Sequence, residues 1–304
     1  MKAQSSPITL SKASAELTES VHVLDERGEP RLVHIACERP LTIYLNKREI
    51  VTLMTLGSDP EALVLGYLRN QGFITSLDQL VAIQVDWDVD AAAVVTHEDP
   101  EGLEEKLQQR TVTTGCGQGT MFGKLMDKIA EVSLPDVSLK QSTVYALLDN
   151  LNRHNETYKN AGAVHGCAIC QGEEVVAFVE DVGRHNAVDT LAGRMWLEGI
   201  DEDNKIFYTT GRLTSEMVIK VAQMGIPVLL SRSGVTQMGL GLACELGITM
   251  LARAKGKHFL QFSGESSLVL DAIPESRGVS SKKVLQSEEK AKLKKANLKT
   301  GAAL

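Results

Sequence analysis

The stretch of sequence that decides the fold is residues 206–251, IFYTTGRLTSEMVIKVAQMGIPVLLSRSGVTQMGLGLACELGITML. It contains three short apolar runs, which predict strands, and two segments between them with the apolar period of a helix. The strands are predicted over 206–209, 228–230 and 248–251, and the helices over 215–224 and 236–246. Strands that alternate with helices predict a layered α/β domain with a largely parallel sheet.

The segments on either side extend this domain to residues 136–264. A helix is predicted over 142–152, a hairpin over 164–170 and 174–179, a second helix over 185–197, and a last strand over 259–262. Ligands of open α/β sheets bind at the carboxyl ends of the strands. The short segments that follow the strands are therefore the places where we expect a site.

Residues 21–110 predict a smaller α+β domain. Strands are predicted over 41–45, 50–54, 80–85 and 91–96, and a helix begins in the sequence Ser58-Asp59-Pro60-Glu61. Ser58 and Glu61 have the spacing of a capping box, and Gly72 suits the helix end. Residues 1–20 are polar, and we expect them to be mobile.

The segment 111–135 is a loop and linker that carries Cys116 between Gly115 and Gly117, with Gly119 close behind. A thiol among glycines is accessible, and neighbouring backbone N–H groups can stabilise its thiolate. Cys116 is therefore a candidate nucleophile or sulfur carrier, although an inert residue in a linker remains the alternative. The last segment, 265–304, has seven lysines and two acidic residues from residue 280 onward, which favours a solvated tail.

Composition excludes several classes of protein. The 304 residues are 43% hydrophobic and 23% charged, as in ordinary globular proteins, and the formal net charge of -7 argues against nucleic acid or a membrane surface as partner. The polar N-terminus lacks a secretory signal, and the longest apolar runs, such as 226–230, are too short to span a bilayer. We therefore predict a cytoplasmic protein.

The five cysteines do not suggest a disulfide framework, because their number is odd and they are sparse. Cys167 and Cys170 form a CxxC spacing, but it falls on a predicted strand, where residues three apart face opposite sides. Two buried small residues are therefore favoured over half of a zinc site. Cys37 and Cys244 stand in apolar contexts and are predicted to belong to the core.

Three strand-to-helix turns carry clustered polar and cationic groups. They are residues 180–189 with Arg184, residues 209–216 with Gly211 and Arg212, and residues 231–236; a fourth cationic segment, 253–257, follows the last strand of the alternation. Each could be a charged helix cap, but together they predict a pocket for a phosphorylated ligand. The sequence has no GxxxxGK(S/T) phosphate loop, no GxGxxG after the first strand, and no HxE with a downstream PCxxC of zinc deaminases.

These blocks together resemble the formate dehydrogenase accessory sulfurtransferase family, FdhD. The resemblance runs from about Glu38 to Phe262. It is carried by Glu38-Arg39-Pro40-Leu41, Gly162-Ala163-Val164-His165, the EDVGRHNAVD run at 180–189, Thr210-Gly211-Arg212-Leu213-Thr214-Ser215-Glu216 with Lys220, and Gly225-Ile226-Pro227.

The resemblance implies a large domain related to cytidine deaminases but without their zinc, and no metal site. Such proteins accept persulfide sulfur from a cysteine desulfurase and pass it to the bis(molybdopterin guanine dinucleotide) form of the molybdenum cofactor, for formate dehydrogenase. Cys116 would hold the persulfide. We expect a homodimer, the commonest assembly of soluble proteins.

By position in the match, residues 251–256 would lie at the cofactor, with Arg253 and Lys255 near its phosphates. Chemistry and placement in the turns add further candidates, with His165 or His185 as possible proton carriers. The full set of candidate cofactor-binding residues is Leu251, Ala252, Arg253, Ala254, Lys255, Gly256, His165, Arg184, His185, Asn186, Asp189, Gly211, Arg212, Glu216, Lys220, Ser231 and Ser233.

The chain departs from the family pattern at two places. Gly119 stands where family members commonly have a second loop cysteine, and Val235 replaces a proline. The first departure excludes a relay between two loop cysteines and leaves open a chaperone that binds the cofactor without moving sulfur. A nucleotide-modifying enzyme of the deaminase type is the other alternative, and it would require zinc.

Overall fold

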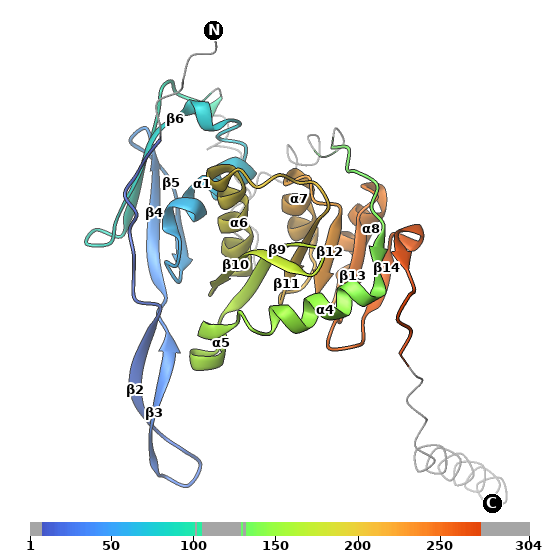
Figure 1. Ribbon diagram of the computed structural model, residues 1–304. Helices are drawn as coiled ribbons and strands as arrows, with labels where there is room; N and C mark the ends of the chain where they lie inside the picture. Colours follow the sequence, from blue (N-terminus) through green and yellow to red (C-terminus); the bar gives the residue numbers. More distant parts are fainter. Residues whose placement is uncertain (1–7, 101, 105–128, 130–131, 275–304) are drawn as a thin grey trace, which may run out of the picture. The chain divides into compact units, whose positions relative to one another are not determined.

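The computed structural model describes residues 8–100, 102–104, 129 and 132–274. Cys116 and its loop, and residues 275–304 with all seven lysines of the last segment, lie outside these residues. The chain divides into two compact units, Met1–Val269 and Leu270–Leu304, and all the elements below belong to the first. Labels follow Figure 1.

The N-terminal part forms a five-stranded sheet in the order β1-β6-β7-β4-β5. Its strands are β1 (Thr9–Leu10), β4 (Arg39–Leu45), β5 (Arg48–Thr55), β6 (Leu80–Asp86) and β7 (Ala91–Thr96). In β4 the residues Leu41, Ile43 and Leu45 are fully buried, while those between them are only half-buried. This alternation is the period-2 pattern of a sheet with one face in the core.

Helix α1 (Pro60–Asn70) packs against that core and ends where predicted, with Gly72 at a positive φ of 71°. The predicted capping box does not form. The residue that caps the helix is Asp59, which makes no side-chain cap hydrogen bond, and Glu61 accepts hydrogen bonds from Ser11 Oγ (2.5 Å) and Ala13 N (2.7 Å). Tertiary partners from the N-terminal segment therefore replace the local cap.

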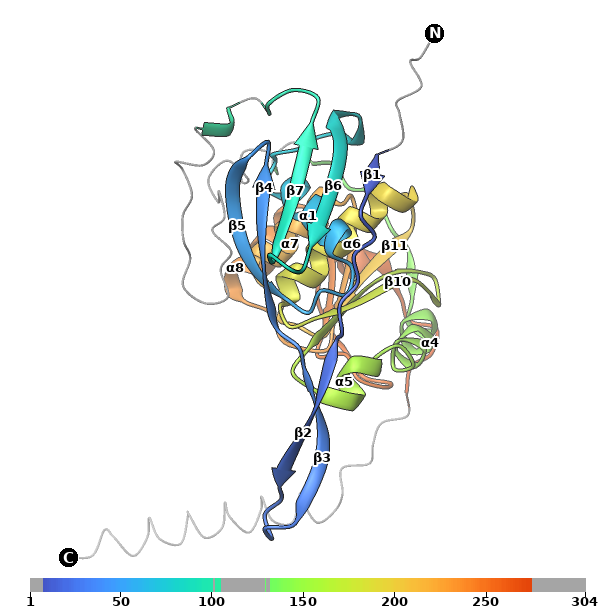
Figure 2. The same cartoon turned by 90° about the vertical axis from the view of Figure 1, so that its left-hand side faces the viewer.

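Two elements near the N-terminus were not expected from the polar sequence. β1 pairs in parallel with β6, Thr9 opposite Ala82, so the expectation of a mobile segment over residues 1–20 is wrong for this stretch. β2 (Thr18–Leu24) and β3 (Pro30–Ala36) form a separate antiparallel hairpin of seven residue pairs, seen in Figure 2 below β4.

The second half of the chain forms a six-stranded sheet in the order β10-β9-β11-β12-β13-β14. The strands are β9 (His165–Gln171), β10 (Glu174–Asp181), β11 (Lys205–Thr209), β12 (Val228–Ser231), β13 (Thr249–Ala252) and β14 (Leu260–Ser263). β12 pairs in parallel with β11 and with β13, whereas the other pairings in this sheet are antiparallel. The prediction of a largely parallel sheet is corrected to a mixed sheet, because the β9–β10 hairpin and the returning β14 close its two sides.

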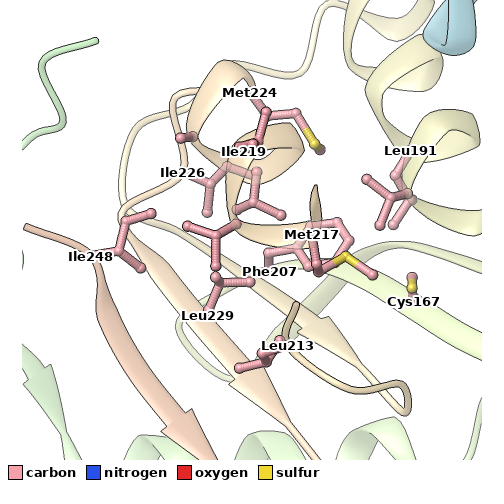
Figure 3. Packing of buried hydrophobic residues seen from close by; sticks show 14 of the residues in the cluster. Cys167, Leu191, Phe207, Leu213, Met217, Ile219, Met224, Ile226, Leu229 and Ile248 are labelled. Carbon is pink, nitrogen blue, oxygen red and sulfur yellow. The ribbon is translucent and has the colours of Figure 1, made fainter. Parts of the chain in front are cut away.

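Helices cover both faces of this sheet (Figure 1). Helices α6 (Arg184–Glu198), α7 (Ser215–Gln223) and α8 (Gln237–Glu245) share one hydrophobic cluster with the sheet, and α4 (Gln141–Leu151) shares the cluster of the other face. Figure 3 shows Met217 and Ile219 of α7 lying over Phe207 and Leu229 of the strands. The remaining elements are α5 (Glu156–Ala161), the pair β8 (Leu139–Lys140) and β15 (Leu268–Val269), and two short 3-10 turns, Leu77–Gln79 and Glu265–Ser267.

The cysteines test the strand prediction directly. Cys167 belongs to the cluster under α6 and α7, Cys170 belongs to the cluster under α4, and neither side chain is exposed. The prediction that these two residues are buried on opposite sides of a strand is confirmed. Cys37 is only half-buried and Cys244 is exposed on α8, so the prediction that both belong to the core is wrong. No helix in the described part of the chain is long and apolar enough to cross a membrane.

Candidate functional site

The sheet topology brings the predicted turns to one edge. β11, β12 and β13 are parallel, so the segments that follow Thr209, Ser231 and Ala252 leave the sheet on the same side. β9 is antiparallel to β11, and β10 is antiparallel to β9. His165 at the start of β9 and the β10–α6 junction therefore lie at this edge as well.

Two cavities open at this edge, and Arg232 lines both. The first has a volume of about 250 Å³ and the second about 310 Å³. The first is lined by Leu148, Asn152, Tyr208, Arg232, Ala254, Lys255 and Gly256, and the second by Asn155, Tyr158, Val164, His165, Gly166, Thr210 and Arg232. Together they extend from the β13–β14 segment to the start of β9.

Hydroxyl groups at the strand ends hold the turns in place. Thr209 Oγ1 accepts hydrogen bonds from Gly211 N (3.0 Å) and from the Cys167 thiol (3.2 Å). Ser231 Oγ donates to Gly211 O (2.7 Å) and accepts from Ser233 N (2.9 Å). These buried polar groups are hydrogen-bonded to one another, so the turns are fastened to the strand ends.

Arg184, the first residue of α6, is the most unusual cation of the site. Its side chain is only 6% exposed, and its Nε is buried without a hydrogen-bond partner in the described part of the chain. Its methylene stem packs against Gly211, where an added Cβ would lie 2.8 Å from Arg184 Cδ. A buried guanidinium group is costly unless an anion compensates it, which makes Arg184 a candidate ligand contact.

His165 lies beside this arginine and lines the second cavity. Its Nδ1 is 3.4 Å from Thr210 Oγ1. Burial, and then the charges of Arg184 and Arg212, lower the pKa of His165 below its ordinary value. His165 is therefore neutral near pH 7 and can accept a proton or a hydrogen bond.

Further cationic and polar groups complete the edge. Arg212, Arg232, Arg253 and Lys255 are exposed and carry a positive field over the cavities. Burial raises the pKa of Tyr208 to about 12, so its hydroxyl in the first cavity remains a hydrogen-bond donor. Within the predicted cofactor segment, Leu251, Ala252 and Ala254 are buried, and the backbone turns sharply at Arg253, whose φ is +52°.

Four of the predicted cofactor-binding residues pack between two helices. His185, Asp189, Glu216 and Lys220 contact one another between α6 and α7, and none of them lines either cavity. Asn186 is also turned inward, since its Nδ2 donates to Met54 O (2.7 Å) and to Asp181 Oδ1 (2.9 Å).

Sequence reasoning left out several residues that line the cavities. Arg232 lies between Ser231 and Ser233, which were predicted to bind the cofactor. Its charge and its place after a strand would have justified predicting it as well. Tyr208 is inside an apolar run, and Leu148, Asn152, Asn155 and Tyr158 come from α4 or from the segment around α5, which no turn motif indicated. Cys116 lies outside the described residues, so its role stays a prediction. No group of His, Cys, Asp and Glu side chains in the described ranges is arranged to hold a metal ion.

The fold and the edge define a mixed α/β protein with several sheets and a cationic, partly buried site suited to an anionic ligand. The FdhD/NarQ family model matches residues 36–269, and the chain belongs to that family.

Named relatives agree with this assignment. The chain is 30% identical over 239 residues to the sulfur carrier protein FdhD of Bacillus subtilis, which covers 77% of this chain and 90% of that protein. It is 27% identical over 265 residues to the sulfur carrier protein FdhD of Wolinella succinogenes, covering 84% and 92% of the two chains. A crystal structure described as a formate dehydrogenase accessory protein from Desulfotalea psychrophila matches with a TM-score of 0.66 and 28% identity, over 83% of this chain and 98% of that one.

Proposed function

We propose that this protein accepts persulfide sulfur from a cysteine desulfurase on Cys116 and passes it to the molybdenum cofactor, in its bis(molybdopterin guanine dinucleotide) form, for use by formate dehydrogenase. The cofactor is the substrate of this transfer. The relatives named as sulfur carriers support the sulfur chemistry, and the described edge of the sheet supports the anionic substrate.

The single observation that carries the proposal is the buried, unpartnered Nε of Arg184 beneath a rim of further cations. Guanidinium groups bind phosphate through paired N–H donors, so Arg184 and Arg212 suit the pyrophosphate groups of a dinucleotide. The two adjoining cavities, about 250 and 310 Å³, suit a long ligand better than a compact one. Leu148 and Ala254 in the first cavity offer apolar surface to a base.

Cys116 carries the sulfur in this proposal. Its thiolate would attack the terminal sulfur of the desulfurase persulfide, and the desulfurase cysteine would leave as a thiolate. In the sequence, Gly115 and Gly117 flank Cys116, and neighbours without side chains leave space for each of two partners to approach the thiol. We expect the neutral His165, which lines the second cavity, to accept a hydrogen bond from the substrate.

The test is sulfur loading of the full chain. Wild type, Cys116→Ala and, as a matched control, Cys244→Ala, whose thiol is exposed on α8, are incubated with a cysteine desulfurase and cysteine. We expect intact-protein mass spectrometry to show one added, reducible sulfur in wild type and in Cys244→Ala. Cys116→Ala should gain none, and it should fail to activate formate dehydrogenase.

Other outcomes identify the alternatives. Full activation of formate dehydrogenase by Cys116→Ala would replace sulfur transfer with a chaperone that only delivers the cofactor, a role that Gly119 in place of a second loop cysteine favours. Stoichiometric zinc in the purified protein would favour a deaminase-type enzyme instead.

A further inference from the structure

Helices α6 and α7 face each other with two ionisable residues apiece, spaced one helical turn apart. His185 and Asp189 lie on α6, and Glu216 and Lys220 lie on α7. Lys220 Nζ is 2.8 Å from Asp189 Oδ2, and His185 Nε2 is 3.3 Å from Glu216 Oε2. Lys220 Nζ is also 3.8 Å from Glu216 Oε1. We call these four residues the α6–α7 quartet.

The quartet is enclosed. The side chain of Asp189 is 0% exposed, that of Lys220 2%, and that of Glu216 15%. Asn70 of α1 adds a hydrogen bond of 2.7 Å from its Nδ2 to Asp189 Oδ1. Buried charges are stable only when they are paired, and the quartet supplies such pairs, Asp189 with Lys220 and His185 with Glu216. These side chains therefore contact one another, and none of them lines the two cavities.

The position of the quartet connects it to the site. His185 directly follows Arg184, and Glu216 comes four residues after Arg212. Between them, the stem of Arg184 packs on Gly211 of the β11–α7 turn. The packing of the first turn of α6 against that of α7 thus determines the distance between the guanidinium groups of Arg184 and Arg212, whose charges both act on His165. Small misplacements of such groups reduce binding strongly.

We propose that the α6–α7 quartet is a set of positioning residues, which fixes the first turns of α6 and α7 so that Arg184 and Arg212 are spaced for their anionic ligand. The identity of that ligand as a guanine nucleotide rests on the function proposed above. The positioning role does not rest on that function, and it can be measured in the ligand-free protein.

The test compares Glu216→Gln with wild type in the full chain. This substitution removes the charge and keeps the size of the side chain. Glu245→Gln, at an exposed residue of α8, is the matched control. Hydrogen exchange is followed by mass spectrometry in ligand-free protein, and binding of guanosine diphosphate is measured by calorimetry. In Glu216→Gln we expect faster exchange at the starts of both helices and about tenfold weaker binding, whereas the control should match wild type.

A second variant, His185→Gln, separates positioning from direct contact. If Glu216 and His185 act as one unit, the variant that carries both substitutions binds guanosine diphosphate no more weakly than the weaker-binding single variant. Additive losses would mean two independent ligand contacts and would overturn the proposal, as would unchanged exchange in Glu216→Gln. If wild type exchanges more slowly than Glu216→Gln and yet fails to bind guanosine diphosphate, that result would support the positioning role and refute the guanine nucleotide as ligand.

Discussion

At the scale of single residues, the site depends on close contacts that tolerate no added atoms. Gly211 leaves room for the Arg184 side chain, and its N–H is held by Thr209 Oγ1 at 3.0 Å. An added Cβ would lie 2.8 Å from Arg184 Cδ and 3.2 Å from its Cβ. Because the Arg184 stem is buried, it cannot simply swing into solvent. We expect Gly211→Ala to displace the guanidinium group and to weaken binding of guanosine diphosphate about tenfold.

A neighbouring turn provides the control for this prediction. Gly234 follows β12 as Gly211 follows β11, but a Cβ there would meet no atom within 4 Å. Calorimetric titration of Gly234→Ala should therefore give the wild-type affinity. If Gly211→Ala also had the wild-type affinity for guanosine diphosphate, the position of Arg184 would not matter for this ligand.

The residue scale also shows where local sequence rules succeed. The burial of Cys167 and Cys170 on opposite faces follows from period-2 alternation alone, so it could be predicted from the sequence. The capping box at Ser58 could not, because Glu61 is bonded to Ser11 and Ala13, and Ser58 Oγ donates instead to Glu180 O (3.3 Å). These partners are distant in sequence, and no local pattern indicates them.

At the scale of elements, α1 and α6 cross through two glycines. A Cβ on Gly66 would lie 1.6 Å from Asp189 O, and a Cβ on Gly193 would lie 2.0 Å from Ala62 O. The two backbones touch, and neither carbonyl can move without breaking its helix. We expect Gly66→Ala or Gly193→Ala to lower the free energy of unfolding by about 3 kcal/mol or more, as measured in urea.

The matched control is Gly241→Ala in α8, where a Cβ would meet nothing within 4 Å. With no contact to oppose it, alanine in a helix should raise the free energy of unfolding by about 0.5–1 kcal/mol. If Gly66→Ala and Gly193→Ala raised the free energy of unfolding as Gly241→Ala does, the backbones of α1 and α6 could not be in contact at these glycines.

Elements with a clear apolar pattern were predicted, and elements without one were not. Helices α6 and α7 and strands β11 to β13 follow the apolar pattern of residues 184–252 closely. The two-residue β1 and the six-residue α5 are too short to show a period, and the side chains of β2 and β3 are mostly exposed, so these strands have no buried face to mark them. As a result, the turns at this edge of the sheet and helix α4 were predicted, but the segment around α5 was not.

At the scale of the whole molecule, the two sheets are joined by contacts that no single segment contains. Asp181 at the end of β10 accepts hydrogen bonds from Thr55 Oγ1 (2.5 Å) and Leu56 N (3.1 Å) of the N-terminal part. It also accepts from Gly183 N (2.8 Å) and Asn186 Nδ2 (2.9 Å) at the start of α6. Arg69 of α1 donates to Ala192 O (2.9 Å) and lies 4.6 Å from the ring centre of Trp196.

The sequence predicts two domains, and these contacts predict that they unfold together. Trp87 and Trp196 both pack against the N-terminal core, whereas far-ultraviolet circular dichroism reports on both parts of the chain, so the two signals should follow one urea transition. Asp181→Asn leaves at least one buried donor without an acceptor and should lower the free energy of unfolding by about 1–3 kcal/mol, still in one transition. Asp203→Asn, at an exposed position, should have no effect. Two separate transitions in wild type would contradict this coupling. They would mean that the two parts unfold independently in spite of the contacts of Asp181.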